Sequence, residues 1–156
     1  MLDIKETLIW GTNELKQNNV SESEKSAEFL LRQVLDWDQA KLIANPDYEL
    51  DEKQENKYRA FIERRKKHEP VWYITDKIEF YGLDLVVNEN VLIPRPETEF
   101  LVEEVLKSKA DNLRILELGT GSGAISLALA TKFKIQNSKF KIMASDISKK
   151  ALEVAK

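Results

Sequence analysis

The sequence predicts an α/β protein in which a helical bundle precedes a β-hairpin and the start of a parallel sheet. Three observations support this fold class. Residues 1–70 place apolar side chains at helical spacing, residues 78–93 alternate apolar and polar side chains, and residues 114–156 follow a strand–loop–helix–strand–helix order. We therefore divide the chain into a bundle over residues 1–70, a hairpin linker over 71–96 and the beginning of an α/β domain over 97–156.

The composition excludes several kinds of chemistry. The 156 residues contain no cysteine and one histidine, His68, so we expect no disulfide, no metal site and no His-based catalytic triad. Lys and Arg total 24 against 27 Asp and Glu, and the net charge is −3. Because this balance is mildly acidic, we expect no direct nucleic-acid binding.

The start of the sequence does not resemble a targeting segment. Charged residues occur within the first few positions, and no window approaches the roughly 18 uncharged apolar residues of a membrane span. We therefore expect a cytoplasmic protein that does not enter a membrane.

The first two helices of the bundle are predicted from apolar spacing and a capping signal. The first helix would turn inward Leu2, Leu8, Ile9 and Leu15. Ser21 and Glu24 have the spacing of a capping box, which predicts the start of the second helix. That helix carries an apolar stripe formed by Ala27, Leu30, Leu31, Val34 and Leu35.

Two further helices follow in the bundle. Gln39–Ala44 should be a short helix that ends before Pro46, because the residue before a proline avoids the helical region. Asp51 and Gln54 give a second capping signal. The helix that they open would bury Tyr58, Phe61 and Ile62. It runs into four cations at residues 64–67, which we expect to form a solvated helix terminus.

The linker combines strand patterns with turn residues. Alternating apolar residues from Ile78 to Ile93, interrupted at Gly82, predict one or two short hairpins. The segment Pro94-Arg95-Pro96 ends this pattern because proline cannot donate to a ladder. Residues 97–107 then read as a helix that would bury Phe100, Leu101 and Val105.

The last segment has the order of a parallel β–α–β unit. Residues 114–118 form an apolar strand, 119–123 a glycine-rich loop and 124–133 a helix with Ile125, Leu127, Ala128 and Leu129 inward. Residues 141–145 form a second strand, and a helix begins in 147–156.

The glycine loop is the motif that carries chemistry. Three glycines at alternate positions, Gly119, Gly121 and Gly123, let a ligand lie directly against the backbone at a helix N-terminus. Asp146 ends the second strand, and a right-handed β–α–β unit places it beside this loop. A carboxylate there can accept hydrogen bonds from ribose hydroxyls. The pattern therefore predicts a site for an adenosine-containing ligand.

Two cofactors fit this pattern. With Ala124 in the last position, the loop matches the spacing of dinucleotide-binding sites, which leaves a nicotinamide-dependent oxidoreductase as an alternative. Glu117, two residues before the first glycine, instead favours S-adenosylmethionine, because a carboxylate suits a sulfonium and an amino group better than a pyrophosphate. More than 100 residues precede the motif, whereas dinucleotide domains often open with it.

Three blocks upstream of the loop carry a resemblance to a known family. They are residues 70–75 (Pro-Val-Trp-Tyr-Ile-Thr), 79–83 (Glu-Phe-Tyr-Gly-Leu) and 91–99 (Val-Leu-Ile-Pro-Arg-Pro-Glu-Thr-Glu). In this order, and followed by 117–123 and Asp146, they resemble the N-terminal part of the HemK/PrmC family of protein-(glutamine-N5) methyltransferases.

This resemblance implies a Rossmann-like class I methyltransferase domain that uses S-adenosyl-L-methionine. The cofactor site would consist of Gly119, Thr120, Gly121, Ser122 and Gly123, with Asp146 on the ribose. The substrate would be the glutamine of a Gly-Gly-Gln loop in peptide-chain release factors, and the helical bundle would help to dock that protein.

The sequence departs from the family pattern at two places. Asp76 stands where the family usually has glycine, which a left-handed turn position tolerates. The family's catalytic Asn-Pro-Pro-Tyr motif is absent, so we assign no catalytic residue and expect the 156 residues to be an inactive, truncated fragment. A binding-only interaction module is the second alternative function.

Overall fold

The computed structural model describes residues 2–108, 112–135 and 139–156. The chain divides into two compact units, Met1–Thr75 and Asp76–Lys156, which are described separately below. In the described part of the chain, no helix combines the length and the apolar character needed to span a bilayer.

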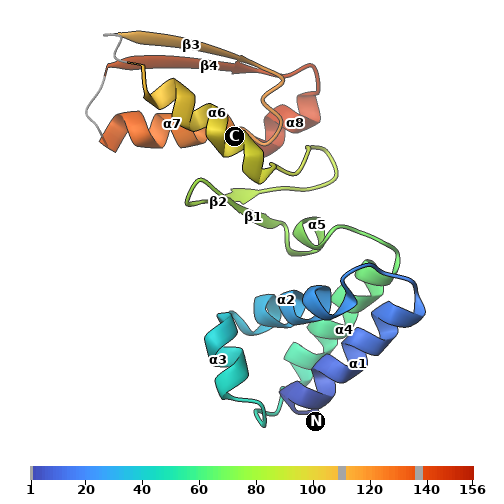
Figure 1. Cartoon of the computed structure of the whole chain (residues 1–156). Coiled ribbons are helices and arrows are strands. Elements are labelled where there is room, and N and C mark those ends of the chain that lie inside the picture. Colours follow the sequence, from blue (N-terminus) through green and yellow to red (C-terminus); the bar gives the residue numbers. More distant parts are fainter. Residues whose placement is uncertain (1, 109–111, 136–138) are drawn as a thin grey trace. The chain divides into compact units, whose positions relative to one another are not determined.

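The described residues of the first unit form helices joined by turns, with one isolated β-bridge between Asp3 and Glu49. Its helices are α1 (Ile4–Gln17), α2 (Ser23–Leu35), α3 (Gln39–Ala44), α4 (Glu52–Lys66) and α5 (Val71–Thr75). The long helices α1, α2 and α4 pack against one another, and α5 contacts α2 and α4 (Figure 1). The bundle therefore continues through α5, a helix that the sequence patterns did not indicate.

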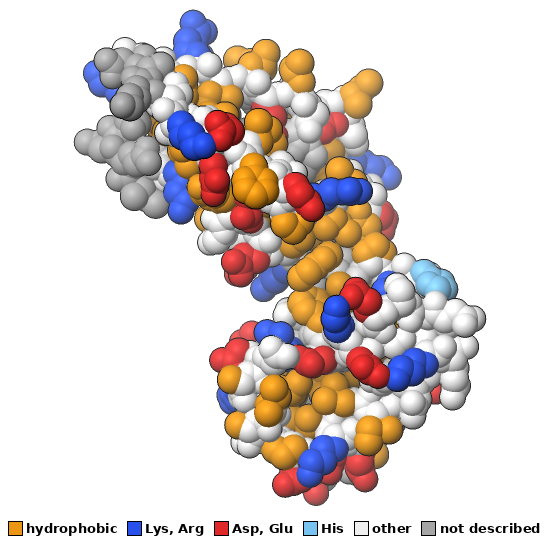
Figure 2. Space-filling view, viewed as in Figure 1, with side chains coloured by type: hydrophobic (Ala, Val, Ile, Leu, Met, Phe, Trp, Pro, Cys, Tyr) orange, Lys and Arg blue, Asp and Glu red, His pale blue; other side chains and the backbone are white. Residues whose placement is uncertain are grey.

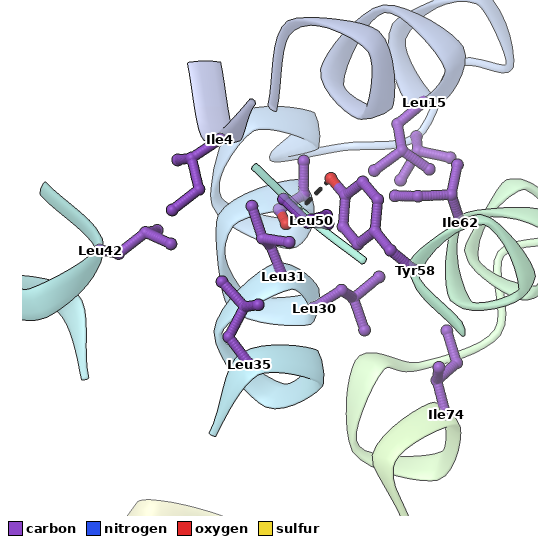
Figure 3. Packing of buried hydrophobic residues seen from close by; sticks show 12 residues of the cluster. Ile4, Leu15, Leu30, Leu31, Leu35, Leu42, Leu50, Tyr58, Ile62 and Ile74 are labelled. Atoms are coloured by element: carbon purple, nitrogen blue, oxygen red, sulfur yellow. Dashed lines mark hydrogen bonds between the residues drawn. The ribbon is translucent and has the colours of Figure 1, made fainter. Parts of the chain in front are cut away.

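Tyr58 on α4 occupies the centre of the bundle core (Figure 3). Its ring lies among leucine and isoleucine side chains from α1, α2 and α4, and its hydroxyl donates to the carbonyl oxygen of Ala27 at 3.2 Å. Gly11 on α1 allows this arrangement, because a Cβ there would collide with the Tyr58 phenol. Burial raises the pKa of Tyr58 above its ordinary value, so the phenol remains protonated at physiological pH.

The predicted helix starts are confirmed at one position and wrong at another. Asp51 and Gln54 form the expected capping box at the start of α4. Ser21 is not a cap, because α2 begins at Ser23 after Glu22 has adopted a left-handed conformation. Glu24 pairs with Lys16 at 2.6 Å.

The apolar stripe of α2 is confirmed, whereas the predicted inward face of α1 is partly wrong. Ala27, Leu30, Leu31 and Leu35 are buried on α2. Ile9 is 62% exposed, because the buried positions of α1 are instead Ile4, Thr7, Gly11 and Leu15.

The first three cations at the end of α4 are partly exposed and bind other groups of the bundle, whereas Lys67 is exposed, so the expected solvated terminus is only partly confirmed. Arg64 donates to Glu69 and to the carbonyl oxygens of Tyr73 and Ile74, at 2.9, 2.9 and 3.1 Å. This hydrogen bonding by Arg64 lowers the pKa of Glu69.

The next two cations also have partners. Arg65 donates to Ser26 Oγ at 3.3 Å and to the Glu69 carbonyl oxygen at 3.0 Å. Lys66 pairs with Glu14 of α1 at 2.8 Å. The run therefore connects α4 to α1, α2 and α5.

The second unit contains a hairpin followed by an α/β layer. Its elements are β1 (Lys77–Phe80), β2 (Leu83–Val86), the 3-10 turn η1 (Pro96–Thr98), α6 (Glu99–Leu106), β3 (Leu113–Leu118), α7 (Ala124–Ile135), β4 (Phe140–Ser145) and α8 (Lys149–Val154). β1 and β2 pair antiparallel, and β3 and β4 pair in parallel, so both predicted pairings are confirmed. Asp76 has a φ of 57°, which is the left-handed conformation expected for it.

The parallel strands are covered by helices on one face. α6 and α7 lie together beneath β3 and β4 (Figure 1). On the other face Leu116, Leu118 and Met143 are 61, 77 and 56% exposed. Hydrophobic side chains protrude from this part of the surface in the space-filling view (Figure 2). Parallel strands are ordinarily buried on both faces, so this face is unusually apolar for an exposed surface.

The inward face predicted for α6 is partly wrong, since Val105 is half-buried but the other two residues expected inside are not. Phe100 and Leu101 are 68 and 52% exposed, whereas Val102 is completely buried. The helix begins at Glu99, after a 3-10 turn over Pro96–Thr98 and two residues later than expected. On α7 Ala128 and Leu129 are buried as expected, but Leu127 is 41% exposed.

Candidate functional site

The glycine loop leaves β3 in a conformation that requires glycine. Gly119, Gly121 and Gly123 have φ values of 74, 56 and 79°, all in the left-handed region. A Cβ at Gly119 or Gly121 would meet no atom within 4 Å, so the space beside both residues is open. A Cβ at Gly123 would instead lie 3.3 Å from the Cβ of Ala155, so this glycine also permits close packing of the chain after α8.

The loop is held to the end of β4 by its own amides. The N–H groups of Gly119 and Thr120 both donate to the carbonyl oxygen of Ser145, at 2.8 and 2.9 Å. The N–H of Gly121 donates to Asp146 Oδ2 at 2.9 Å. Only the last of these bonds uses a side-chain acceptor, so it is the one that a ligand could replace without separating the strands.

Asp146 lies against the loop, where the strand order places it. Its other oxygen, Oδ1, accepts from the N–H of Ser148 at 2.9 Å. The backbone N–H groups of Ser148 and Gly121 lower the pKa of Asp146, so the carboxylate is charged at neutral pH. The carboxylate is half-exposed, and its remaining lone pairs can accept from hydroxyl groups.

Glu117 forms a second carboxylate centre at the base of the loop. Its Oε2 accepts from the hydroxyl of Thr120 at 2.9 Å and also from the hydroxyl of Ser126 in the first turn of α7. Sequence reasoning did not assign a role to Ser126. The only available signal was a hydroxyl in the first turn of the helix that follows the glycine loop.

A pocket of about 190 Å³ joins the glycine loop to the proline-containing block of residues 91–99. Leu92, Pro94, Arg95 and Thr98 line one part of it. The remaining lining comes from Ala124, Ile125 and the candidate site residues Glu117, Gly119, Thr120, Gly121 and Ser122. The two blocks that were separate motifs in the sequence therefore line one pocket.

The remaining predicted residues lie outside the lining. Gly123 packs against Ala155, and Asp146 reaches the site through its bond to Gly121. Glu99 is also outside, because its Oε1 accepts from the N–H of Tyr81 at 2.8 Å and so anchors the hairpin turn to α6. No group of three or more potential metal ligands occurs among the residues that the structure describes.

Comparison with known proteins gives consistent matches. Residues 6–75 match the profile of the PrmC N-terminal domain. The chain is 43% identical to a release factor glutamine methyltransferase of Coxiella burnetii over 160 residues, covering 99% of this chain and 55% of that protein. Proteins of the same name from Clostridium acetobutylicum and Bacillus subtilis are 41 and 37% identical, each over 99% of this chain and 54% of the relative.

The fold is a helical bundle, a β-hairpin and the first βαβα portion of a Rossmann-like class I methyltransferase domain. The chain spans about half the length of the curated relatives that it matches. It belongs to the HemK/PrmC family, of which it corresponds to the N-terminal part.

Proposed function

We propose that this protein acts in the S-adenosylmethionine-dependent N5-methylation of the glutamine in the Gly-Gly-Gln motif of peptide-chain release factors. Its described residues would supply part of the cofactor site and the bundle that docks the release factor. The observation that carries the proposal is the open space beside Gly119 and Gly121, in a loop that donates hydrogen bonds to the carboxylates of Glu117 and Asp146.

The residues present fit the cofactor in both shape and charge. The missing Cβ atoms of Gly119 and Gly121 leave room for a ligand against the backbone. Asp146 is charged and can accept from the two ribose hydroxyls, while Glu117 offers a negative charge to the amino group or the sulfonium. When bound, S-adenosylmethionine supplies an electrophilic methyl group. A pyrophosphate would meet repulsion from both carboxylates.

The substrate amide makes a separate demand on the site. The lone pair of an amide nitrogen is delocalised into its carbonyl group, so the nitrogen must be held and oriented before it can attack the methyl group. In the family this role belongs to the Asn-Pro-Pro-Tyr motif, which these 156 residues do not contain. We therefore expect the chain to provide binding and docking surfaces and not the groups that orient the amide.

Titration of the full-length gene product with S-adenosylhomocysteine and with NAD tests the cofactor. We expect saturable binding of S-adenosylhomocysteine and none of NAD. A second measurement follows the transfer of labelled methyl groups to a release factor, with a factor whose Gly-Gly-Gln glutamine is replaced by alanine as the control. Binding of NAD alone would support the oxidoreductase, and binding of a release factor with neither cofactor would support an interaction module.

A further inference from the structure

Two hydroxyl groups from different elements converge on one oxygen of Glu117. Thr120 donates from the glycine loop at 2.9 Å, and Ser126 donates from the first turn of α7. Both bonds end on Oε2. Two donors that approach from separate elements restrict the rotation of the carboxylate, because turning the group would break both hydrogen bonds.

The other oxygen of Glu117 is left for a ligand. In the part of the chain that the structure describes, no hydrogen bond is found on Oε1. Glu117 and Thr120 line the pocket beside the glycine loop, whereas Ser126 does not. Ser126 can therefore influence a ligand only through the carboxylate that it holds.

We propose that Ser126 is a positioning residue that fixes Glu117, so that Oε1 is presented to the cationic amino group of the methyl donor. This inference rests on the proposed function and adds a residue to the same site. A charge-assisted bond between an ammonium group and a carboxylate is among the stronger polar interactions in proteins. It is stronger still when the acceptor is already oriented, because less side-chain entropy is lost on binding.

The test separates the amino-acid end of the ligand from its adenosine end. S-adenosylhomocysteine carries both ends, whereas 5′-methylthioadenosine lacks the amino-acid group. In the full-length gene product, Ser126→Ala should raise the dissociation constant for S-adenosylhomocysteine about tenfold, the order expected for a weakened bond to a charged group. The constant for 5′-methylthioadenosine should not change. Ser126→Thr keeps a hydroxyl and should restore the binding of S-adenosylhomocysteine.

Thr131→Ala is the matched control, since Thr131 lies on the same helix and also loses a hydroxyl. It should leave both dissociation constants unchanged. Alanine has a higher helix propensity than serine, so α7 is retained in Ser126→Ala, and thermal melting followed by circular dichroism checks this. The positioning role is overturned if Ser126→Ala weakens both ligands equally or neither of them. If the unaltered protein binds neither ligand, the proposed function itself fails.

Discussion

Asp146 combines two tasks at the scale of a single residue. Its carboxylate holds the amide of Gly121 and the amide of Ser148, and under the proposed function it also receives the ribose. A bound ribose would therefore share Asp146 Oδ2 with the amide of Gly121. The residue connects the conformation of the loop with occupancy of the site.

Replacing Asp146 should separate these tasks. In the full-length gene product, Asp146→Ala should weaken S-adenosylmethionine binding by about 1.5–3 kcal/mol, the size of a lost charge-assisted interaction. Asp146→Asn keeps an acceptor for the amide of Gly121 and should lose less binding free energy than Asp146→Ala. Isothermal titration calorimetry gives both values. An unchanged dissociation constant for Asp146→Ala would place the ribose elsewhere.

Thr7 is a buried polar residue in the bundle core. It is 1% exposed, and its hydroxyl is buried with no hydrogen-bond partner among the described residues. An unsatisfied buried hydroxyl costs free energy, so Thr7→Val, which has nearly the same shape, should raise the free energy of unfolding by about 1–2 kcal/mol.

Chemical denaturation of the unaltered protein and of Thr7→Val measures this difference. Thr7→Ser provides the control, since it keeps the hydroxyl and removes a buried methyl group, and it should lower the stability. Equal or lower stability of Thr7→Val would mean that the hydroxyl is satisfied in solution.

At the scale of elements, α5 completes the helical bundle. Ile74 is 1% exposed within the bundle core, and Trp72 packs edge-on against Phe29 of α2 with ring centroids 4.6 Å apart. The ring contact joins α5 to a helix more than 30 positions earlier in the sequence. A boundary at residue 70 would remove both residues.

We therefore expect residues 1–75 to fold alone and cooperatively, and to be more stable than residues 1–70. Losing a fully buried isoleucine costs about 2–5 kcal/mol. Thermal unfolding of both fragments by circular dichroism measures the difference. Identical midpoints for the two fragments would show that α5 contributes nothing to the bundle.

Sequence patterns predicted those features of the fold that depend on neighbouring residues. The Asp51 cap, the α2 stripe and the glycine loop each follow from local spacing, and the structure contains all three. Which face of a helix turns inward depends on its neighbours in space. For that reason Ile9 and Phe100 were assigned to the interior and are exposed.

The residues of the candidate site also include some that local spacing predicted and some that depend on packing. The glycine loop and Asp146 were found because strand order determines which chain ends meet in a parallel unit. Ser126 and the lining from Leu92 to Thr98 were not predicted, since their meeting with the loop depends on how α6 and α7 pack. The assignment of these residues to a cofactor stays a prediction.

At the scale of the whole molecule, the proposed function divides between the two units. The bundle would dock the protein substrate, and the second unit holds the glycine loop and its two carboxylates. Neither contains the Asn-Pro-Pro-Tyr group that would orient the substrate amide.

Residues 1–156 expressed alone should therefore transfer no methyl group to a release factor. Positioning contributes much of the barrier reduction in a reaction between two bound molecules, so its loss should bring the rate to background. Incorporation of labelled methyl groups measures this. A relative named as a release factor glutamine methyltransferase serves as the positive control. Transfer by residues 1–156 above background would require catalytic groups among Arg95, Glu97, Glu99 and Glu117.

The partners of the cations that end α4 have a consequence for molecular recognition. Arg64 is paired with Glu69, and Lys66 is paired with Glu14. The carboxylates therefore cancel most of the electrostatic field of the two cations within a few ångströms. Long-range steering of an acidic partner needs uncompensated charge, which this end of α4 supplies only weakly. Association with a release factor should therefore slow by no more than about twofold when the ionic strength rises from about 50 to about 200 mM. Stopped-flow mixing measures this rate, and a steep fall would indicate a steering surface on another part of the protein.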